Sequence, residues 1–134
     1  SVSAVLGTNG ALAKVLPGYE SRPRQLAMSL DVGASIRDDE VLMVEAGTGV
    51  GKSLAYLTPL VLHVLETGER AIVSTATKAL QDQLTEHDAP LLLRALGRQV
   101  RVEPIKGRAN YLCCRKLWEA YSGARGTVLA EDGK

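Results

Sequence analysis

The sequence predicts an α/β fold in which helices flank a parallel β-sheet. Short apolar runs alternate with longer segments of helical pattern, in the order strand, helix, strand, helix, strand, and this alternation is typical of a parallel sheet. A glycine-rich segment, residues 46–51, joins the first apolar run to the longest helical segment. The chain of 134 residues has the length of about one domain.

Composition and charge exclude several classes of protein. Hydrophobic residues make up 46% of the chain and charged residues 23%, which excludes a disordered chain, a collagen and a disulfide-rich scaffold. The longest apolar run, 54–65, is shorter than the roughly 20 residues that span a membrane, and no signal peptide opens the chain. The two cysteines are adjacent, which favours a reducing compartment. We therefore expect a cytoplasmic protein without a membrane partner.

Two helices are expected in the N-terminal part of the chain. A short helix fits residues 11–16. Ser21 is a candidate N-cap for a second helix, which tolerates Pro23 in its first turn and extends to about Ile36. The polar residues 37–40 then predict a solvated break.

The remaining elements are placed by apolar runs, which indicate buried strands, and by residues that begin or end helices. Thr side chains cap helix N-termini, Pro is tolerated in a first turn, and Gly ends helices. In chain order these signals predict a strand at 41–44, the glycine-rich segment, a helix to Thr67 ended by Gly68, a strand at 71–74, a helix capped by Thr77 and extending to about His87, a helix from Pro90 to about Gly97, a strand at 100–105 and a helix over 110–121.

A nucleotide-binding motif lies between the first predicted strand and its helix. Residues 46–53 match the P-loop pattern G-x-x-x-x-G-K-[ST], except that Ala46 replaces the first Gly. In this motif backbone N–H groups and a helix N-terminus face phosphate oxygens. Lys52 and Ser53 are the candidate catalytic residues, because Lys52 would reach the β- and γ-phosphates of ATP and Ser53 would ligate Mg²⁺. The candidate ATP-binding residues here are Ala46, Gly47, Thr48, Gly49, Val50, Gly51, Lys52 and Ser53.

Four segments, which together cover roughly residues 19–117, resemble the motifs of one helicase family in their order and spacing. Residues 45–53 resemble its motif I, 19–25 its adenine-reading segment, 72–84 its motif Ia, and 106–113 the run that leads into its first cluster cysteine. The family that carries these motifs is the DinG-type DNA helicases, in the iron–sulfur group of superfamily 2. The resemblance implies a RecA-like P-loop NTPase fold.

The resemblance also implies roles for residues outside the P-loop. Arg22 and Gln25 would contact adenine, for which an amide suits because it both donates and accepts. Cys113 would ligate a 4Fe–4S cluster, although Cys114 stands where the family more often has Pro, which leaves open which thiolate binds. Residues that would hold the single-stranded DNA backbone, or face it beside the cluster, are Ser74, Thr75, Thr77, Lys106 and Arg108. The basic stretch 94–125 is otherwise a solvated face.

The expected organisation is an N-terminal extension at 1–18, the N-terminal part of helicase motor domain 1 at 19–105 and the start of an iron–sulfur insertion at 106–134. A cluster needs four thiolates, and a motor needs a carboxylate motif after a strand; neither is complete in this sequence. We therefore expect a truncated chain with an incomplete sheet, which binds ATP without turnover and does not hold the cluster.

The expected function of the full-length protein is ATP-dependent DNA unwinding, coupled to translocation on single-stranded DNA during repair or replication. Two alternatives from other classes remain: a P-loop phosphotransferase such as a small-metabolite kinase, and a nucleotide-binding module without catalysis. A relative with a nuclease domain and no cluster is a further alternative. The stretch that resembles motif Ia favours the helicase over the kinase. The sequence does not predict the oligomeric state.

Overall fold

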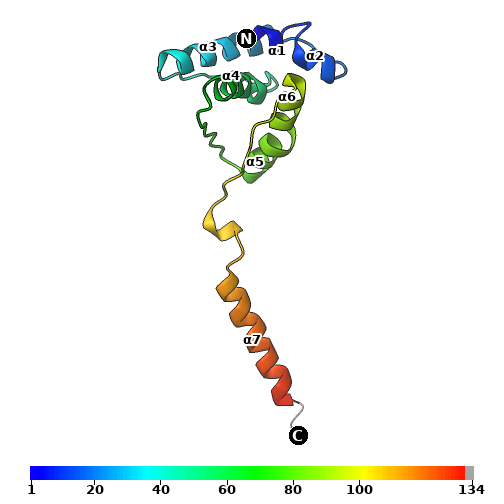
Figure 1. Cartoon of the computed structure of the whole chain (residues 1–134), viewed down its shortest axis with the longest axis vertical. Helices are drawn as coiled ribbons and strands as arrows, with labels where there is room; N and C mark the ends of the chain where they lie inside the picture. The colour runs from blue at the N-terminus through cyan, green and yellow to red at the C-terminus, as the bar shows by residue number, and fades with distance from the viewer. Residues whose placement is uncertain (132–134) are drawn as a thin grey trace. The chain divides into compact units, whose positions relative to one another are not determined.

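The computed structural model describes residues 1–131, with side chains described up to residue 123. The chain divides into two units, Ser1–Pro104 and Ile105–Lys134 (Figure 1). Within the described residues all regular structure is helical. None of the helices described there has the length and apolar character that a membrane span requires.

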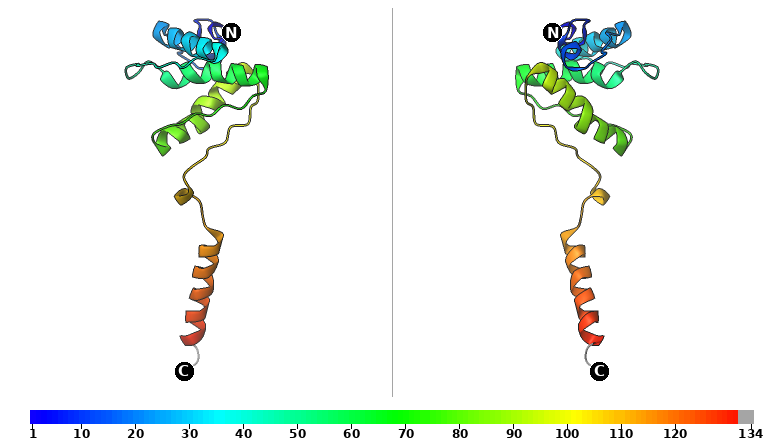
Figure 2. Two further views of the ribbon diagram at one scale, coloured as in Figure 1. Left: turned by 90° about the vertical axis from the view of Figure 1, so that its left-hand side faces the viewer. Right: turned by 90° about the vertical axis from the view of Figure 1, so that its right-hand side faces the viewer.

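The first unit consists of helices packed around one aliphatic core. Its elements are α1 (Ser3–Leu6), α2 (Ala11–Val15), α3 (Pro23–Asp38), α4 (Lys52–Thr67), α5 (Lys78–Gln83), a π-helical turn (Leu84–Asp88) and α6 (Ala89–Leu96). Helix α3 packs along α4, and α6 contacts both α2 and α4 (Figure 2). The buried core residues are Val2, Val5, Leu6, Leu12, Leu57, Val61, Leu84 and Leu92.

Small residues allow α3 to approach α4 closely. Ser29 on α3 and Ala55 and Thr58 on α4 are completely buried. A Cβ added at Gly33 would lie 3.4 Å from the Cβ of Pro59. This packing places the first turn of α3 beside the N-terminus of α4, where the two helices are joined by a hydrogen bond.

Three predicted helix boundaries are confirmed. Helix α4 ends at Gly68 and α6 at Gly97, both in the left-handed conformation that is common after a helix. Thr77 caps α5, since its hydroxyl accepts a hydrogen bond from the backbone N–H of Leu80 at 3.2 Å. Local signals in the sequence therefore place these helix ends correctly.

The prediction that Ser21 caps α3 is wrong. The helix begins at Pro23, and Arg22 occupies the N-cap position without a capping side chain. The Ser21 hydroxyl instead donates to the carbonyl of Leu6 at 2.9 Å, because the packing of α1 brings this acceptor within reach. Helix α3 also runs to Asp38, inside the predicted polar break.

The two helices predicted on either side of residue 88 are one continuous helix. The π-helical turn joins α5 to α6 without a break, and the N–H of Ala89 donates to the carbonyl of Leu84. Pro90 has no backbone N–H, so the carbonyl of Glu86 lacks its usual donor four residues later. The wider ladder of a π-turn accommodates such a missing hydrogen bond.

The predicted parallel sheet is not formed within the described residues. The segments predicted as strands, 41–44, 71–74 and 100–105, have no regular secondary structure there. The side chains of Val41 and Ile72 are 100% and 93% exposed. An apolar run becomes a buried strand only where neighbouring strands pair with it and helices cover both faces, whereas here the helices pack on one another.

The second unit begins with a short turn stabilised by local hydrogen bonds. A 3₁₀ turn, Arg108–Asn110, precedes α7 (Cys114–Glu131). The Nδ2 of Asn110 donates to the carbonyl of Gly107 at 3.0 Å, and the phenol of Tyr111 accepts from the backbone N–H of Lys106 at 2.9 Å. The helix predicted over 110–121 therefore begins later, because residue 110 belongs to the turn.

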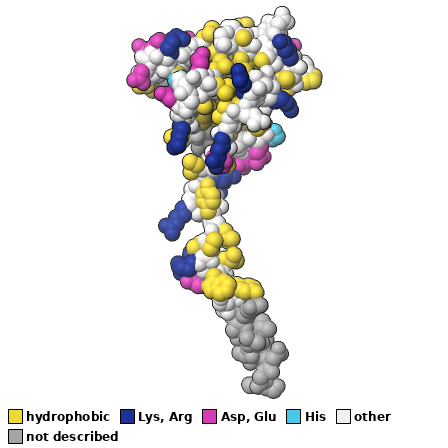
Figure 3. All heavy atoms as spheres, in the orientation of Figure 1, with side chains coloured by type: hydrophobic (Ala, Val, Ile, Leu, Met, Phe, Trp, Pro, Cys, Tyr) yellow, Lys and Arg dark blue, Asp and Glu magenta, His cyan; other side chains and the backbone are white. Residues whose placement is uncertain are grey.

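Hydrophobic side chains are exposed on this second unit (Figure 3). Trp118 and Tyr121 form a tilted aromatic pair with ring centroids 6.2 Å apart. On the same helix, Arg115 and Glu119 form an ion pair at a spacing of four residues. The exposed hydrophobic side chains are Ile105, Tyr111, Leu112, Leu117, Trp118 and Tyr121.

Candidate nucleotide-binding site

The glycine-rich segment forms a tight loop that leads into α4. Gly49 and Gly51 have left-handed backbone conformations, with φ of 80° and 83°, which glycine adopts without the steric cost that a Cβ imposes. Gly51 occupies the N-cap position of α4. The loop therefore ends at a helix N-terminus, where partial positive charge favours anions. Thr48 is exposed and Val50 is half-buried in the turn.

Lys52, the first residue of α4, folds back onto this loop. Its Nζ donates to the carbonyl oxygens of Ala46 at 2.7 Å and Gly47 at 3.0 Å. The ammonium group therefore lies within the bend of the loop and satisfies two backbone acceptors there. An anionic phosphate oxygen would be a stronger acceptor than either carbonyl, because hydrogen bonds between ionised partners are shorter and stronger.

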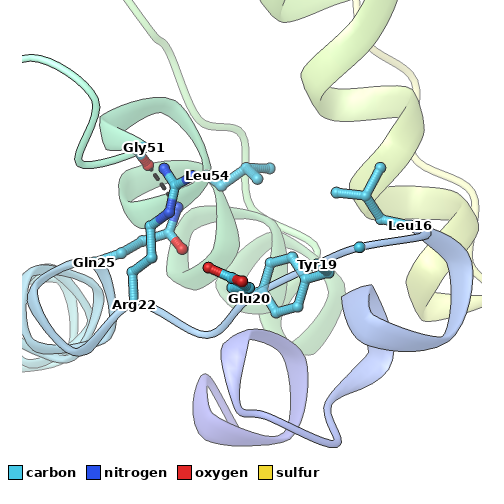
Figure 4. Close-up of a pocket in the computed structure, with 8 residues that line it drawn as sticks. Leu16, Tyr19, Glu20, Arg22, Gln25, Gly51 and Leu54 are labelled. Atoms are coloured by element: carbon cyan, nitrogen blue, oxygen red, sulfur yellow. Dashed lines mark hydrogen bonds between the residues drawn. The ribbon is translucent and has the colours of Figure 1, made fainter.

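Two side chains from residues 19–25 hold the same loop from the side of α3. Arg22 Nη1 donates to the carbonyl of Gly49 at 2.7 Å, and Gln25 Nε2 donates to the carbonyl of Gly51 at 2.9 Å. Gln25 is buried, whereas Arg22 is exposed. Figure 4 shows both side chains beside Gly51. The fold thus brings together two segments that are predicted separately from the sequence. Arg22 and Gly49 are 27 positions apart in the chain, and Gln25 and Gly51 are 26 apart.

A cavity of about 210 Å³ lies beside these contacts (Figure 4). Leucine and tyrosine side chains give it apolar walls, and the Oε1 of Gln25 remains an acceptor once Nε2 has donated to the loop. Burial raises the pKa of the Tyr19 phenol, and the nearby Arg22 charge partly opposes this rise, so Tyr19 is neutral at neutral pH. The cavity is lined by Leu16, Gly18, Tyr19, Glu20, Arg22, Gln25, Gly51 and Leu54.

Ser53 lies in the first turn of α4, three positions before Tyr56. Burial raises the pKa of the Tyr56 phenol, the nearby Ser53 hydroxyl lowers it, and the charge of Asp88 raises it. A serine hydroxyl has two lone pairs that can ligate a cation. No three His, Cys, Asp or Glu side chains in the described part of the chain cluster around a possible metal site. A Mg²⁺ ion at Ser53 would therefore take further ligands from phosphates and water, as this ion commonly does.

The hydroxyl residues predicted to bind DNA lie just before α5. Ser74 is exposed, and the Oγ1 of Thr75 donates to the carbonyl of Thr77 at 3.2 Å. Thr77 is the cap of α5, so both threonines have local structural contacts that are compatible with a neighbouring phosphate. In the second unit Lys106 is half-buried and Arg108 is exposed.

The two cysteines are exposed free thiols at the start of α7. Cys113 precedes the helix and Cys114 is its first residue. A 4Fe–4S cluster takes four thiolate ligands, whereas the described residues supply this adjacent pair and hold no cluster of three candidate ligands. The donor set described here therefore does not make up a cluster site.

Four residues of the site are absent from the sequence-based prediction. Leu16, Gly18 and Leu54 line the cavity, and Tyr56 lies near Ser53. Leu54 and Tyr56 follow the motif within α4, so helical periodicity is a signal that points to them. Leu16 lies at the end of α2, and only the tertiary packing brings it to the cavity.

Comparison with known proteins supplies the family. A family model described as DEAD/DEAH box helicase matches residues 28–112. The chain is 39% identical to the ATP-dependent DNA helicase YoaA of Haemophilus influenzae, over 99% of this chain and 21% of that protein. It is 44% identical to YoaA of Escherichia coli, over 81% of this chain and 16% of that protein.

A third relative is named as an exonuclease. The 3'-5' exonuclease DinG of Bacillus subtilis is 33% identical, over 83% of this chain and 12% of that protein. The chain spans about a fifth or less of the length of these three relatives.

Proposed function

The chain belongs to the DEAD/DEAH box helicase family, and from this membership we propose that it supplies the ATP-binding part of a DinG-type ATP-dependent DNA helicase. The family implies a P-loop NTPase fold. The observation that carries the proposal is the hydrogen bond between Gln25 and the carbonyl of Gly51, because it joins the segment that resembles an adenine reader to the phosphate-binding motif.

In the proposed site the nucleotide phosphates lie at the loop and the base lies in the neighbouring cavity. Backbone amides at the N-terminus of α4 favour the phosphates. Lys52 would exchange its contacts with the carbonyls of Ala46 and Gly47 for phosphate oxygens. Apolar side chains of Leu16 and Leu54 would face the base, and the amide of Gln25 would hydrogen-bond to it.

Ser53 is proposed as a protein ligand of the Mg²⁺ that accompanies ATP. When bound, this ion neutralises charge that develops on the phosphates. The contribution of this chain is to hold the Ser53 hydroxyl in the first turn of α4, directly after Lys52.

The three segments predicted as strands support a proposal about the rest of the fold. Val41, Met43 and Ile72 are almost fully exposed, although such runs are typical of strands buried on both faces. We infer that 41–44, 71–74 and 100–105 become strands of a parallel sheet in the full-length protein, where they would pair with strands that the described residues do not provide.

Single-stranded DNA is the proposed second partner. The support is the resemblance to motif Ia and the local excess of basic side chains, which suits a phosphate backbone. The residues proposed to contact it are Ser74, Thr75, Thr77, Lys106 and Arg108. The proposal that Cys113 ligates a 4Fe–4S cluster rests on the resemblance of residues 106–113 alone.

The alternatives differ in how they fit the family. A small-metabolite kinase does not agree with a family match that covers residues 28–112 and describes helicases. A nuclease-associated relative remains a second candidate, because one matched protein is named an exonuclease. Assays of duplex unwinding and of DNA degradation by the full-length protein would distinguish a helicase from a nuclease-associated relative.

The proposed ATP site is tested by substituting its lysine. In the full-length protein, Lys52→Ala should weaken ATP binding by about tenfold or more, because the phosphates lose a charged donor. Lys14→Ala, which removes an exposed lysine from α2, is the matched control and should retain full affinity. Fluorescence titration with a labelled ATP analogue measures both. Unchanged affinity in Lys52→Ala would show that the nucleotide binds elsewhere.

A further inference from the structure

Arg22 makes a contact that differs from the one expected of a base-binding residue. Its Nη1 donates to the backbone carbonyl of Gly49 at 2.7 Å, in the middle of the phosphate-binding loop. Gly49 has a left-handed backbone conformation, with φ of 80°. The guanidinium therefore binds the loop at the residue where its direction changes.

The geometry of a peptide unit gives this contact a consequence. The C=O and N–H of a trans peptide point in opposite directions across a rigid plane. When Arg22 binds the carbonyl of Gly49, it also fixes the direction of the N–H of Val50. Amides of such loops are the groups that face phosphate oxygens.

Gln25 holds the Gly51–Lys52 peptide in the same manner. It binds the carbonyl of Gly51 at 2.9 Å, which fixes the N–H of Lys52 at the start of α4. Gln25 is buried, whereas Arg22 is exposed. Arg22 therefore binds the solvent-facing part of the loop, which could reorient without this contact.

We propose that Arg22 is a positioning residue for the phosphate-binding loop: it orients the Gly49–Val50 peptide toward the polyphosphate of any nucleoside triphosphate and does not select the base. This inference rests on the proposed ATP site and goes beyond it, since it assigns Arg22 to the phosphates rather than to adenine. If Arg22 positions the loop, its substitution should weaken the binding of ligands with and without a base by the same factor.

The test uses the full-length protein and three ligands, namely ATP, GTP and inorganic tripolyphosphate. Arg22→Ala should weaken all three by a similar factor of about ten, as expected for the loss of one hydrogen bond from a charged donor. The ratio of ATP to GTP affinity should stay unchanged. Arg22→Lys should recover most of the loss, because an ammonium group can also donate to the Gly49 carbonyl.

Two controls separate positioning from a general loss of structure. Arg37→Ala removes an exposed arginine at the opposite end of α3, whose partner is the adjacent Asp38, and should bind all three ligands normally. With tripolyphosphate bound, amide hydrogen exchange should become faster at Val50 in Arg22→Ala while the exchange of amides within α6 is unchanged.

Different failures identify different errors. If Arg22→Ala lowers ATP affinity but leaves tripolyphosphate affinity unchanged, Arg22 reads the base and the inference is wrong. If Lys52→Ala weakens all three ligands and Arg22→Ala weakens none, the ATP site stands and the inference alone is overturned. If Lys52→Ala also has no effect, the proposed site itself is wrong.

Discussion

Gly49 and Gly51 share a left-handed backbone conformation but differ in their surroundings. Nothing lies within 4 Å of a Cβ added at Gly49. A Cβ at Gly51 would instead overlap the Nε2 of Gln25, the atom that hydrogen-bonds to this residue. Gly51 is therefore required both for its conformation and for the close approach of the glutamine.

This difference predicts unequal effects of two matched substitutions. Gly49→Ala should cost about 1–2 kcal/mol of backbone strain and leave the Gln25 contact intact. Gly51→Ala carries similar strain and also displaces Gln25, so it should reduce ATP affinity substantially more. Chemical unfolding and ATP titration of both variants measure the comparison. Equal losses of ATP affinity would show that the Gln25 contact does not matter for binding.

Single residues of the site differ in how well the sequence predicts them. The P-loop is recognised because its glycines, Lys52 and Ser53 are adjacent in the chain, so their spacing alone defines a local geometry. The contact between Arg22 and Gly49 spans 27 positions and depends on the packing of α3. The resemblance to a helicase motif assigned Arg22 to the base, and no local pattern could have assigned it to the loop.

At the scale of elements, the packing of α3 on α4 decides whether the site exists. Gln25 belongs to α3 and its acceptor Gly51 caps α4. The helices approach closely at Gly33, where an added Cβ would reach Pro59 at 3.4 Å. A change in the spacing of these helices should therefore alter nucleotide binding at a distance from the nucleotide.

Two substitutions of one glycine test this dependence. Gly33→Ala adds a methyl group at contact distance and improves helix propensity by about 1 kcal/mol, so it should retain stability and ATP affinity. Gly33→Leu should separate α3 from α4 and weaken ATP binding, because overpacked interfaces shift their elements. Thermal unfolding and ATP titration provide the readouts. Full affinity in Gly33→Leu would mean that the loop does not depend on this interface.

Helices are predicted better than strands for a physical reason. Gly68, Thr77 and Gly97 end or begin helices through local hydrogen bonds, so the sequence nearby is sufficient. Ser21 misleads because a distant carbonyl competes for its hydroxyl. The segments 41–44 and 71–74 have suitable composition, but parallel strands form only with partners that are far away in the chain.

At the scale of the whole molecule, the two units differ in how their apolar residues are buried. The first has a continuous aliphatic core, whereas aromatic and aliphatic side chains of the second are exposed through residue 121. The family match ends at residue 112, close to the start of the second unit. The sequence therefore predicts more about the candidate nucleotide site than about the role of residues 105–131.

We propose that the phosphates of ATP bind at residues 46–53 while residues 19–25 hold the loop and contact the base. A crystal structure of the full-length protein with Mg²⁺ and a non-hydrolysable ATP analogue tests it most directly. We expect Lys52 Nζ to leave the carbonyls of Ala46 and Gly47 for the phosphates. Arg22 should stay on the Gly49 carbonyl, and the base should occupy the cavity beside Gln25. An analogue bound elsewhere, with Lys52 still on those two carbonyls, would contradict it.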